Sequence, residues 1–160
     1  MHLTIVRHAR AREKRSWTGD DLLRPLDAVG ERQAQALAQL LAKHEVRRIV
    51  CSPALRCQQS VQPLADMVEL PVERWDELGP DGAGSAIAAA CFANAAFDDA
   101  VLCTHGELMQ PLTRLDDLRR LVPKRDLRQD RLLRKGSAWR LRISGEGRIT
   151  RFEHLVPARH

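Results

Sequence analysis

The chain has 160 residues, enough for one domain with a hydrophobic core and too few for two of ordinary size. Its residues are 44% hydrophobic and 29% charged, a balance that excludes a disordered chain. No apolar run approaches the roughly 20 residues that a membrane-spanning helix needs, and the N-terminus has no signal-peptide core. We therefore expect a single cytoplasmic domain over residues 1–160, with no membrane partner.

The charge balance favours anionic partners, because 26 lysines and arginines face 21 acidic residues and give a formal net charge of +5. Aromatic residues make up only 4% of the chain and tyrosine is absent, which leaves few platforms for stacking bases. A nucleic-acid partner would therefore rest on charge alone and is not expected. The four cysteines form no CxxC pair and lie in apolar segments, so we expect reduced, buried thiols rather than zinc ligands or disulfides.

Strands and helices alternate along most of the chain. In chain order, the predicted elements are a strand at 3–6, a helix beginning at Pro25, a strand at 47–51, a helix introduced by Ser52-Pro53, a strand at 70–72, a helix at 86–96, a strand at 100–104, a helix at 107–121, and strands at 139–143 and 149–152. Ser52 is interpreted as a helix N-cap, and residues 10–21 as a polar loop. This order predicts an α/β fold, a three-layer αβα sandwich with a mostly parallel central sheet and a C-terminal β-hairpin.

Residues suited to phosphate chemistry follow three of the predicted strands. The first strand ends in Arg7 and His8, the second leads into Ser52 with Arg56 just beyond, and the fourth ends in His105. In open α/β sheets, ligands bind just beyond the carboxyl ends of the strands. Arginine binds phosphate oxygens with a planar, permanently charged fork, and a neutral imidazole can attack phosphorus and form a phosphohistidine. The pattern predicts a phosphoryl-transfer site that requires no metal or other cofactor.

Three ordered segments resemble the signatures of the histidine phosphatase superfamily, the phosphoglycerate mutase-like proteins. They read LTIVRHAR at residues 3–10, VCSPALRCQQSV at 50–61 and LCTHGEL at 102–108. Residues 21–38, DLLRPLDAVGERQAQALA, are similar to the first helix of short bacterial phosphohistidine phosphatases and of the phosphatase-like domain attached to some Nudix hydrolases. The resemblance covers most of the chain and implies a metal-independent phosphatase.

The resemblance also implies roles for individual residues. His8 matches the phosphoacceptor, Arg7 and Arg56 match the two phosphate-binding arginines, and His105 matches the second histidine, which is both catalytic and phosphate-binding. Ala9 stands where the family usually has glycine, which an alanine can replace if the backbone keeps a negative φ.

The proton donor is matched less directly. Glu77, in the segment WDELGPDG, is the closest match, and Asp81 is the second. An imidazole leaving group needs less help from an acid than an alkoxide, so a weak donor suits phosphohistidine or anhydride substrates. The expected substrate is a phosphorylated protein side chain, above all phosphohistidine, or a small phosphoester or nucleotide. The alternative is a weakly active or inactive phosphate-binding module that serves a Nudix-type or other partner.

The polar loop after His8 has two interpretations. Arg10, Arg12, Lys14 and Arg15, together with Trp17, either select the substrate or form a solvated basic segment.

Overall fold

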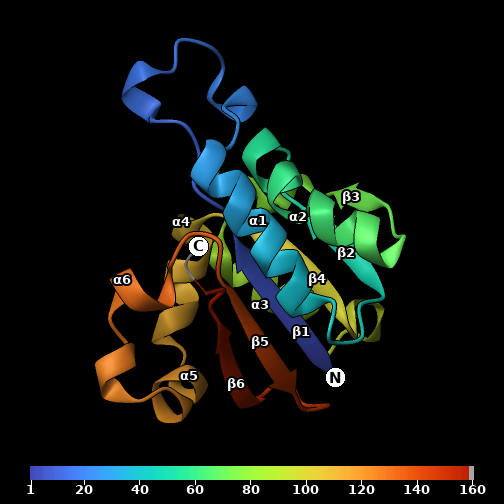
Figure 1. Cartoon of the computed structure of the whole chain (residues 1–160). Helices are drawn as coiled ribbons and strands as arrows, with labels where there is room; N and C mark the ends of the chain where they lie inside the picture. Colours follow the sequence, from blue (N-terminus) through green and yellow to red (C-terminus); the bar gives the residue numbers. More distant parts are fainter. Residues whose placement is uncertain (159–160) are drawn as a thin grey trace.

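The computed structural model describes residues 1–158 (Figure 1). Six strands form one sheet in the order β3-β2-β4-β1-β5-β6. The strands are β1 (His2–Arg7), β2 (Arg48–Cys51), β3 (Val72–Arg74), β4 (Ala100–Thr104), β5 (Ala138–Ile143) and β6 (Ile149–Leu155). The helices are α1 (Ala28–Leu41), α2 (Leu55–Val68), α3 (Gly84–Cys91), α4 (Gly106–Met109), α5 (Asp116–Leu121) and α6 (Gln129–Leu132).

The sheet is mostly parallel, as the sequence predicts. Strands β3, β2, β4 and β1 run in one direction, while β5 pairs antiparallel with β1 and then with β6 in a hairpin. The register aligns Arg7 with Thr104 and Cys51 with Cys103, so the carboxyl ends of β1, β4 and β2 lie at one edge. The residues that follow these three strands must therefore meet there.

Helices cover both faces of the sheet because the apolar strand residues alternate between them. On one face, Val6 and Val101 pack with buried residues of α1 and α2. On the other face, Ile5 and Leu102 pack with buried residues of α3, α4, α5 and α6. Figure 1 shows α1 and α2 lying together over the sheet, with α5 and α6 beside the hairpin. The predicted three-layer sandwich is confirmed.

The predicted start of the first helix is wrong by three residues. Asp27 caps α1, because its carboxylate accepts a hydrogen bond from the Gly30 N–H at 2.8 Å. Before this cap, Leu26 forms an isolated antiparallel bridge with Ala11, and the Pro25 carbonyl accepts a bond from Arg12. This pairing holds the segment extended, so Pro25 belongs to the loop rather than to the first helical turn.

The helix predicted over 107–121 is divided into three pieces. The first, α4, ends at Met109, a 3-10 turn follows at Gln110–Arg114, and α5 starts at Asp116. Pro111 accounts for the break, because it lacks the N–H that a continuous helix requires there. Within residues 1–158, no helix is long and apolar enough to cross a bilayer.

Candidate active site

Two histidines meet at the carboxyl edge of the sheet. The rings of His8 and His105 lie with their centroids 5.2 Å apart and their planes at 63°. Both residues are buried, with exposed fractions of 7% and 1%. The His8 N–H donates to the Thr104 carbonyl at 3.0 Å, which fastens the end of β1 to the end of β4. The structure thus brings together the two histidines that the sequence places about a hundred residues apart.

The hydrogen bond of the His8 ring fixes its tautomer. Nδ1 lies 2.8 Å from the Ala9 carbonyl oxygen, which can only accept, so Nδ1 carries the proton and Nε2 keeps a lone pair. Burial lowers the pKa of His8 to about 3, and the positive charges of Arg56 and Arg7 act in the same direction. At neutral pH this imidazole is therefore uncharged.

Ala9 is accommodated where the family usually has glycine. Its side chain is fully buried, and it is not among the residues with a positive φ. The Ala9 N–H donates to Ser60 Oγ at 2.8 Å, and the Ser60 hydroxyl donates to the Arg56 carbonyl at 2.6 Å. This chain of bonds docks the segment after His8 onto the first turns of α2, so the backbone needs no glycine here.

The two arginines each leave one buried nitrogen without a partner. Arg56 is 4% exposed and donates through Nη1 to the Asp21 carbonyl at 2.8 Å and through Nη2 to Asp21 Oδ2 at 3.2 Å. Arg7 donates through Nη1 to the Leu133 carbonyl. Within residues 1–158, Nε of Arg7 and Nε of Arg56 are the only side-chain nitrogen or oxygen atoms that are themselves shielded from solvent and lack a hydrogen bond. Buried donors are normally satisfied, so these two mark a place for an acceptor.

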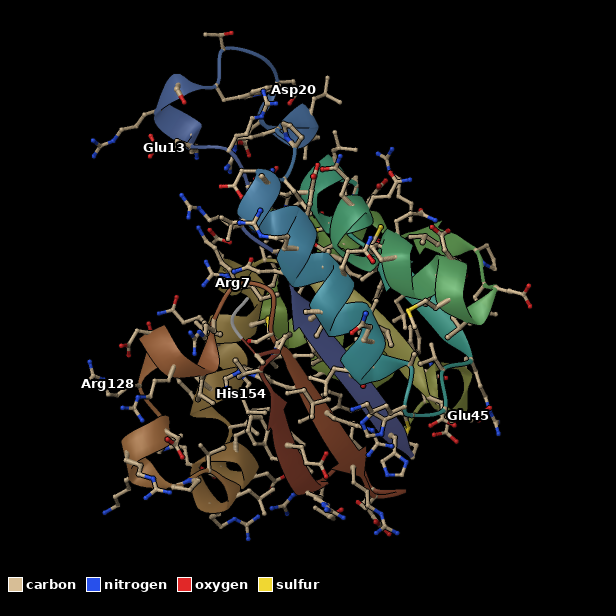
Figure 2. The ribbon with its side chains drawn as sticks, viewed as in Figure 1. Arg7, Glu13, Asp20, Glu45, Arg128 and His154 are labelled. Carbon is tan, nitrogen blue, oxygen red and sulfur yellow. The ribbon has the colours of Figure 1, made fainter. Side chains whose placement is uncertain are left out.

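A glycine lets Arg7 lie close to the start of α4. A Cβ on Gly106 would come within 2.9 Å of Arg7 Cζ, so the Arg7 guanidinium occupies the space of the missing side chain. Figure 2 shows Arg7 at the end of β1, below the long loop that carries Glu13 and Asp20.

Ser52 supports His105 and does not cap a helix as the sequence predicts. The N-cap of α2 is Ala54, whose N–H donates to Ser52 Oγ at 3.1 Å. The same Oγ lies 2.8 Å from His105 Nε2, and Cys57 Sγ lies 3.6 Å from this ring nitrogen. Within the described residues Nδ1 of His105 has no hydrogen bond, so it is the ring nitrogen that can face a ligand. A serine and a histidine that follow neighbouring strands are the sequence signal for this contact.

Glu77 lies at the rim of this region. It belongs to a 3-10 turn, Asp76–Leu78, that follows β3, and its side chain is exposed. The Leu78 carbonyl accepts a hydrogen bond from Thr104 Oγ1 at 2.7 Å, so the turn is anchored next to the strand end that carries His105. The carboxylates of Glu77 and the similarly exposed Asp81 make no hydrogen bond or ion pair within residues 1–158. The assignment of Glu77 as the proton donor stays a prediction.

The contact between Asp21 and Arg56 was not predicted from the sequence. Asp21 opens a short 3-10 turn at the end of the basic loop, and it binds both terminal nitrogens of Arg56. The positive charges of Arg24 and Arg56 lower the pKa of Asp21, against the effect of its partial burial. No local pattern indicates this pairing, because the two residues are 35 positions apart.

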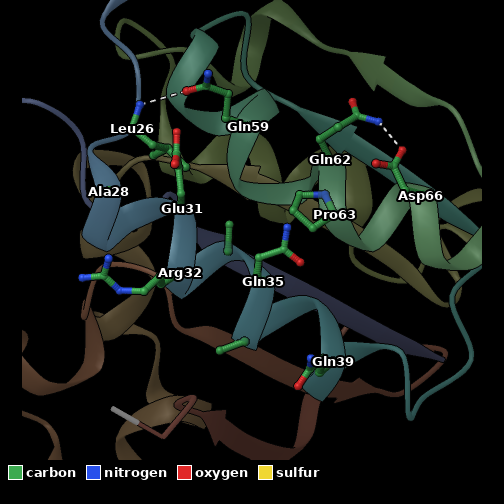
Figure 3. Close-up of a pocket in the computed structure, with 12 residues that line it drawn as sticks. Leu26, Ala28, Glu31, Arg32, Gln35, Gln39, Gln59, Gln62, Pro63 and Asp66 are labelled. Atoms are coloured by element: carbon green, nitrogen blue, oxygen red, sulfur yellow. Dashed lines mark hydrogen bonds between the residues drawn. The ribbon is translucent and has the colours of Figure 1, made fainter. Parts of the chain in front are cut away.

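One cavity of the molecule lies away from this chemistry. It measures about 750 Å³ and lies between α1 and α2, where Figure 3 shows Gln35, Gln59, Gln62 and Pro63 around it. Within residues 1–158, no three His, Cys, Asp or Glu side chains are placed to hold a metal ion.

Comparisons with known proteins agree with this geometry. A family model of the histidine phosphatase superfamily (branch 1) matches residues 3–79. The structure of the protein histidine phosphatase SixA complexed with tungstate superposes with a TM-score of 0.76 at 24% identity, covering 98% of this chain and 97% of that one. The alpha-ribazole phosphatase from Shigella flexneri superposes with a TM-score of 0.64 at 19% identity, covering 99% and 97%. At these identities the two structures show the fold.

A curated relative adds a sequence match to part of the chain. An 8-oxo-(d)GTP phosphatase from Mycolicibacterium smegmatis is 35% identical over 65 residues, which are 41% of this chain. The aligned segment spans only 20% of that protein's length.

The fold and the paired histidines at the sheet edge define an α/β protein with the architecture of these structural matches. Both the family model and the structural matches point to one group within it. Residues 3–79 match the histidine phosphatase superfamily (branch 1), as the sequence motifs predict, and the whole chain has the fold of its members.

Proposed function

We propose that the protein is a metal-independent histidine phosphatase in which His8 is transiently phosphorylated. The observation that carries this proposal is the tautomer of His8: Nδ1 donates to the Ala9 carbonyl, so a neutral ring keeps its Nε2 lone pair. In the first step Nε2 bonds to phosphorus while the bond from phosphorus to the leaving group breaks. In the second step water attacks the phosphohistidine, releasing inorganic phosphate and restoring His8.

The neighbouring groups would neutralise the transferred phosphoryl oxygens. Nε of Arg7 and Nε of Arg56 are buried donors without a protein acceptor, and an anion at the sheet edge would satisfy both. His105 would donate from Nδ1, because Ser52 and Cys57 occupy the surroundings of its Nε2. These contacts involve no metal ion.

The proposed substrate is a phosphorylated protein side chain, in particular phosphohistidine, or a small phosphoester or nucleotide. Phosphohistidine is favoured because the carboxylate of Glu77 is exposed and makes no contact that would orient it as an acid. Cleavage of a phosphoramidate releases an imidazole, which needs less protonation than an alkoxide. The likeness to a protein histidine phosphatase supports this class, and the partial match to an 8-oxo-(d)GTP phosphatase supports nucleotides.

A weakly active phosphate-binding module, serving a Nudix-type or other partner, is the second candidate. One contact favours it: both terminal nitrogens of Arg56 are already bound by Asp21, which leaves less of the guanidinium for a substrate. Turnover of a generic aryl phosphate separates the two candidates.

The proposal is tested by trapping the intermediate. We expect a labelled phosphoryl group to appear on the protein during turnover and to be labile to acid and stable to alkali. His8→Ala should abolish both the label and turnover, a loss on the order of 10⁴-fold or more, because no second nucleophile is available. The matched control is His44→Ala, in the turn after α1 at the opposite edge of the sheet, which should behave as wild type.

Two results would overturn the assignment. One is a label on serine or cysteine, and the other is near-normal turnover in His8→Ala. A chelator should leave the activity intact, and a loss that a divalent cation restores would count against metal independence.

A further inference from the structure

A buried thiol lies behind the second histidine of the candidate site. Cys57 belongs to the first turn of α2 and is fully buried. Its Sγ lies 3.6 Å from Nε2 of His105, the ring nitrogen that Ser52 Oγ also approaches. Because His105 is buried as well, the contact between the sulfur and the ring is shielded from water. Neither step of the proposed reaction uses this thiol.

Two hydrogens compete for one acceptor if the thiol and the ring are both neutral. A neutral His105 ring that is protonated on Nδ1 has one lone pair, at Nε2. Ser52 Oγ accepts from the Ala54 N–H at 3.1 Å, so its own hydrogen can bond to this lone pair at 2.8 Å. The thiol hydrogen is left with the Thr104 carbonyl, which lies 3.8 Å away and already accepts from the His8 N–H at 3.0 Å. A neutral thiol therefore has a weak acceptor here.

Transfer of the thiol proton to the ring gives both groups a strong partner. The S–H bond of Cys57 breaks, an N–H bond forms at Nε2 of His105, and the imidazolium donates to the thiolate. The Ser52 hydroxyl and the Cys103 thiol are also hydrogen-bonded to this sulfur. Nδ1 of His105 keeps its own proton, so it still faces a ligand as a donor. The two buried charges then compensate each other.

The thiols around this contact differ in how readily they ionise. Burial raises the pKa of Cys57, but hydrogen bonds to Cys103, His105 and Ser52 outweigh burial and bring the pKa below the ordinary value of a thiol. Burial raises the pKa of Cys51 to about 12, and it raises the pKa of Cys103 well above the ordinary value. The side chains of α1 in the same buried cluster are apolar. Cys57 is therefore the thiol of this cluster that can carry a charge near neutral pH.

The other charges of the site make a negative sulfur useful. The ring centroid of His8 lies 5.2 Å from that of His105, and burial, the main cause, lowers the pKa of His8 to about 3, so His8 is neutral. Arg7 and Arg56 are the cations at this edge, and Asp21 is already paired with Arg56. Two arginines oppose a further positive charge on His105. A thiolate on the far side of the ring offsets that repulsion.

We infer that Cys57 is a positioning residue of the candidate active site, whose thiolate holds His105 as an imidazolium so that Nδ1 donates to the phosphoryl group from a charged ring. The effect on turnover rests on the proposed function, whereas the ionisation of Cys57 does not. Hydrogen bonds from a charged donor are roughly twice as strong as those from a neutral one. The sulfur thus acts on the reaction through His105 and does not touch the substrate.

The first experiment titrates the ultraviolet absorbance of the thiolate in the whole protein without substrate. We expect the absorbance of one thiolate to appear below the ordinary thiol pKa of about 8.5. Cys57→Ser should remove this signal, and His105→Gln should move it to higher pH because the imidazolium is lost. The matched control is Cys91→Ser, because Cys91 is a buried thiol of α3 on the other face of the sheet whose pKa burial raises to about 12. Cys91→Ser should keep the signal.

Two results of this titration would overturn the inference. One is a thiolate signal that is absent below the ordinary thiol pKa or that survives in Cys57→Ser. The other is a signal that His105→Gln leaves unmoved, because the thiolate would then have no imidazolium partner.

The second experiment compares the pH profiles of aryl phosphate turnover. Serine keeps a small polar group at this position but does not ionise, so His105 in Cys57→Ser loses its proton at a lower pH than in wild type. The ratio of wild-type to Cys57→Ser turnover should be near one in acid and grow to about tenfold as the pH rises. Cys57→Ala should give the same trend if Cys57→Ser folds poorly, and Cys91→Ser should give none.

A ratio that stays constant with pH would mean that Cys57 only fills space, and the inference would be wrong. If wild type shows no turnover at any pH, the proposed function fails. The absorbance titration then still decides whether Cys57 holds the charge of His105.

Discussion

Two clusters of buried polar groups in this protein differ in how far their hydrogen bonds are satisfied. Between α5 and the C-terminal hairpin, the carboxylate of Asp117 accepts bonds from Arg120, from Arg148 and from the Ile149 N–H at 3.0 Å. At the carboxyl edge of the sheet, buried nitrogens of Arg7 and Arg56 have no partner. The hydrogen bonds of the first cluster are satisfied within the protein, whereas under the proposed function an anion would complete those of the second.

The comparison separates two kinds of buried charge. An unsatisfied buried donor reduces stability by about 1–3 kcal/mol, so a protein keeps one where a ligand supplies the missing partner. Substitutions at the sheet edge should therefore act mainly on turnover. Substitutions in the Asp117 cluster should act mainly on stability.

The largest effect in this comparison is a loss of turnover, expected on substitution of His105 or of Ser52, which holds the His105 ring. His105→Ala should lower turnover by about 10²–10³-fold, because one donor to the developing charge is lost. Ser52→Ala should lower it by about tenfold, since Ser52 acts by holding the His105 ring at 2.8 Å. The measurement is the rate of aryl phosphate hydrolysis for folded protein, with the melting temperature recorded for each variant.

Ser52→Thr supplies the control, because it keeps the hydroxyl. Recovery of most of the activity in Ser52→Thr would confirm that the hydroxyl positions the ring. If Ser52→Ala lowers the melting temperature as much as the activity, Ser52 is structural and the comparison fails at this residue.

The sequence predicts the parts of this site that depend on local patterns. Short apolar runs that end abruptly in an arginine or a histidine predict that Arg7, His8 and His105 lie at strand ends, and parallel strands bring such ends to one edge. The support of His105 was not predictable in this way. Ser52-Pro53 has the local pattern of a helix cap, yet the Ser52 hydroxyl bonds to a ring 53 positions later in the chain.

The contacts of the segment between His8 and α1 were not predicted, for a related reason. Pro25 fits a first helical turn locally, but the bridge of Leu26 to Ala11 holds the chain extended. Asp21 lies in a polar loop whose charges all resemble solvated residues, and only the folded structure brings it to Arg56. Pairing between distant segments therefore decides these details.

An intermediate effect, on stability, is expected at Asp117. Asp117→Asn should lower the free energy of unfolding by about 1–3 kcal/mol, since charge-assisted bonds to two arginines are lost and the Ile149 N–H binds a weaker acceptor. For a chain of this size that corresponds to a fall of several degrees in melting temperature. Turnover per folded molecule should stay at the wild-type level.

The stability difference between wild type and Asp117→Asn should also change with pH in a defined direction. Bonds from Arg148 hold the pKa of Asp117 well below its ordinary value, so its stabilising effect is complete above the unfolded-state pKa, near 4. As the pH falls below that value, the effect diminishes, and the difference between wild type and Asp117→Asn should shrink. Asp116→Asn, on an exposed neighbour in the same helical turn, is the control and should show no such difference. A difference that is constant with pH would mean that packing, and not charge, is lost.

The smallest effect, on inhibition by an anion, is expected at Asp21. This carboxylate binds Arg56, one of the two arginines at the sheet edge that have an unpartnered nitrogen. The Asp21 carboxylate lies 3.2 Å from Nη2 of buried Arg56 and 2.9 Å from Nε of Arg24, so it resembles the Asp117 cluster. An anion at the sheet edge would compete with this carboxylate for Arg56 and be repelled by its charge. Asp21→Asn keeps an oxygen in place and removes the charge, so orthovanadate should inhibit about two- to fivefold more strongly, as for an exposed ion pair. Because salt screens such contacts, the gain should vanish at high ionic strength, and Asp66→Asn on α2 should show none. Weaker inhibition of Asp21→Asn would show that Asp21 positions Arg56 for the anion instead of competing with it.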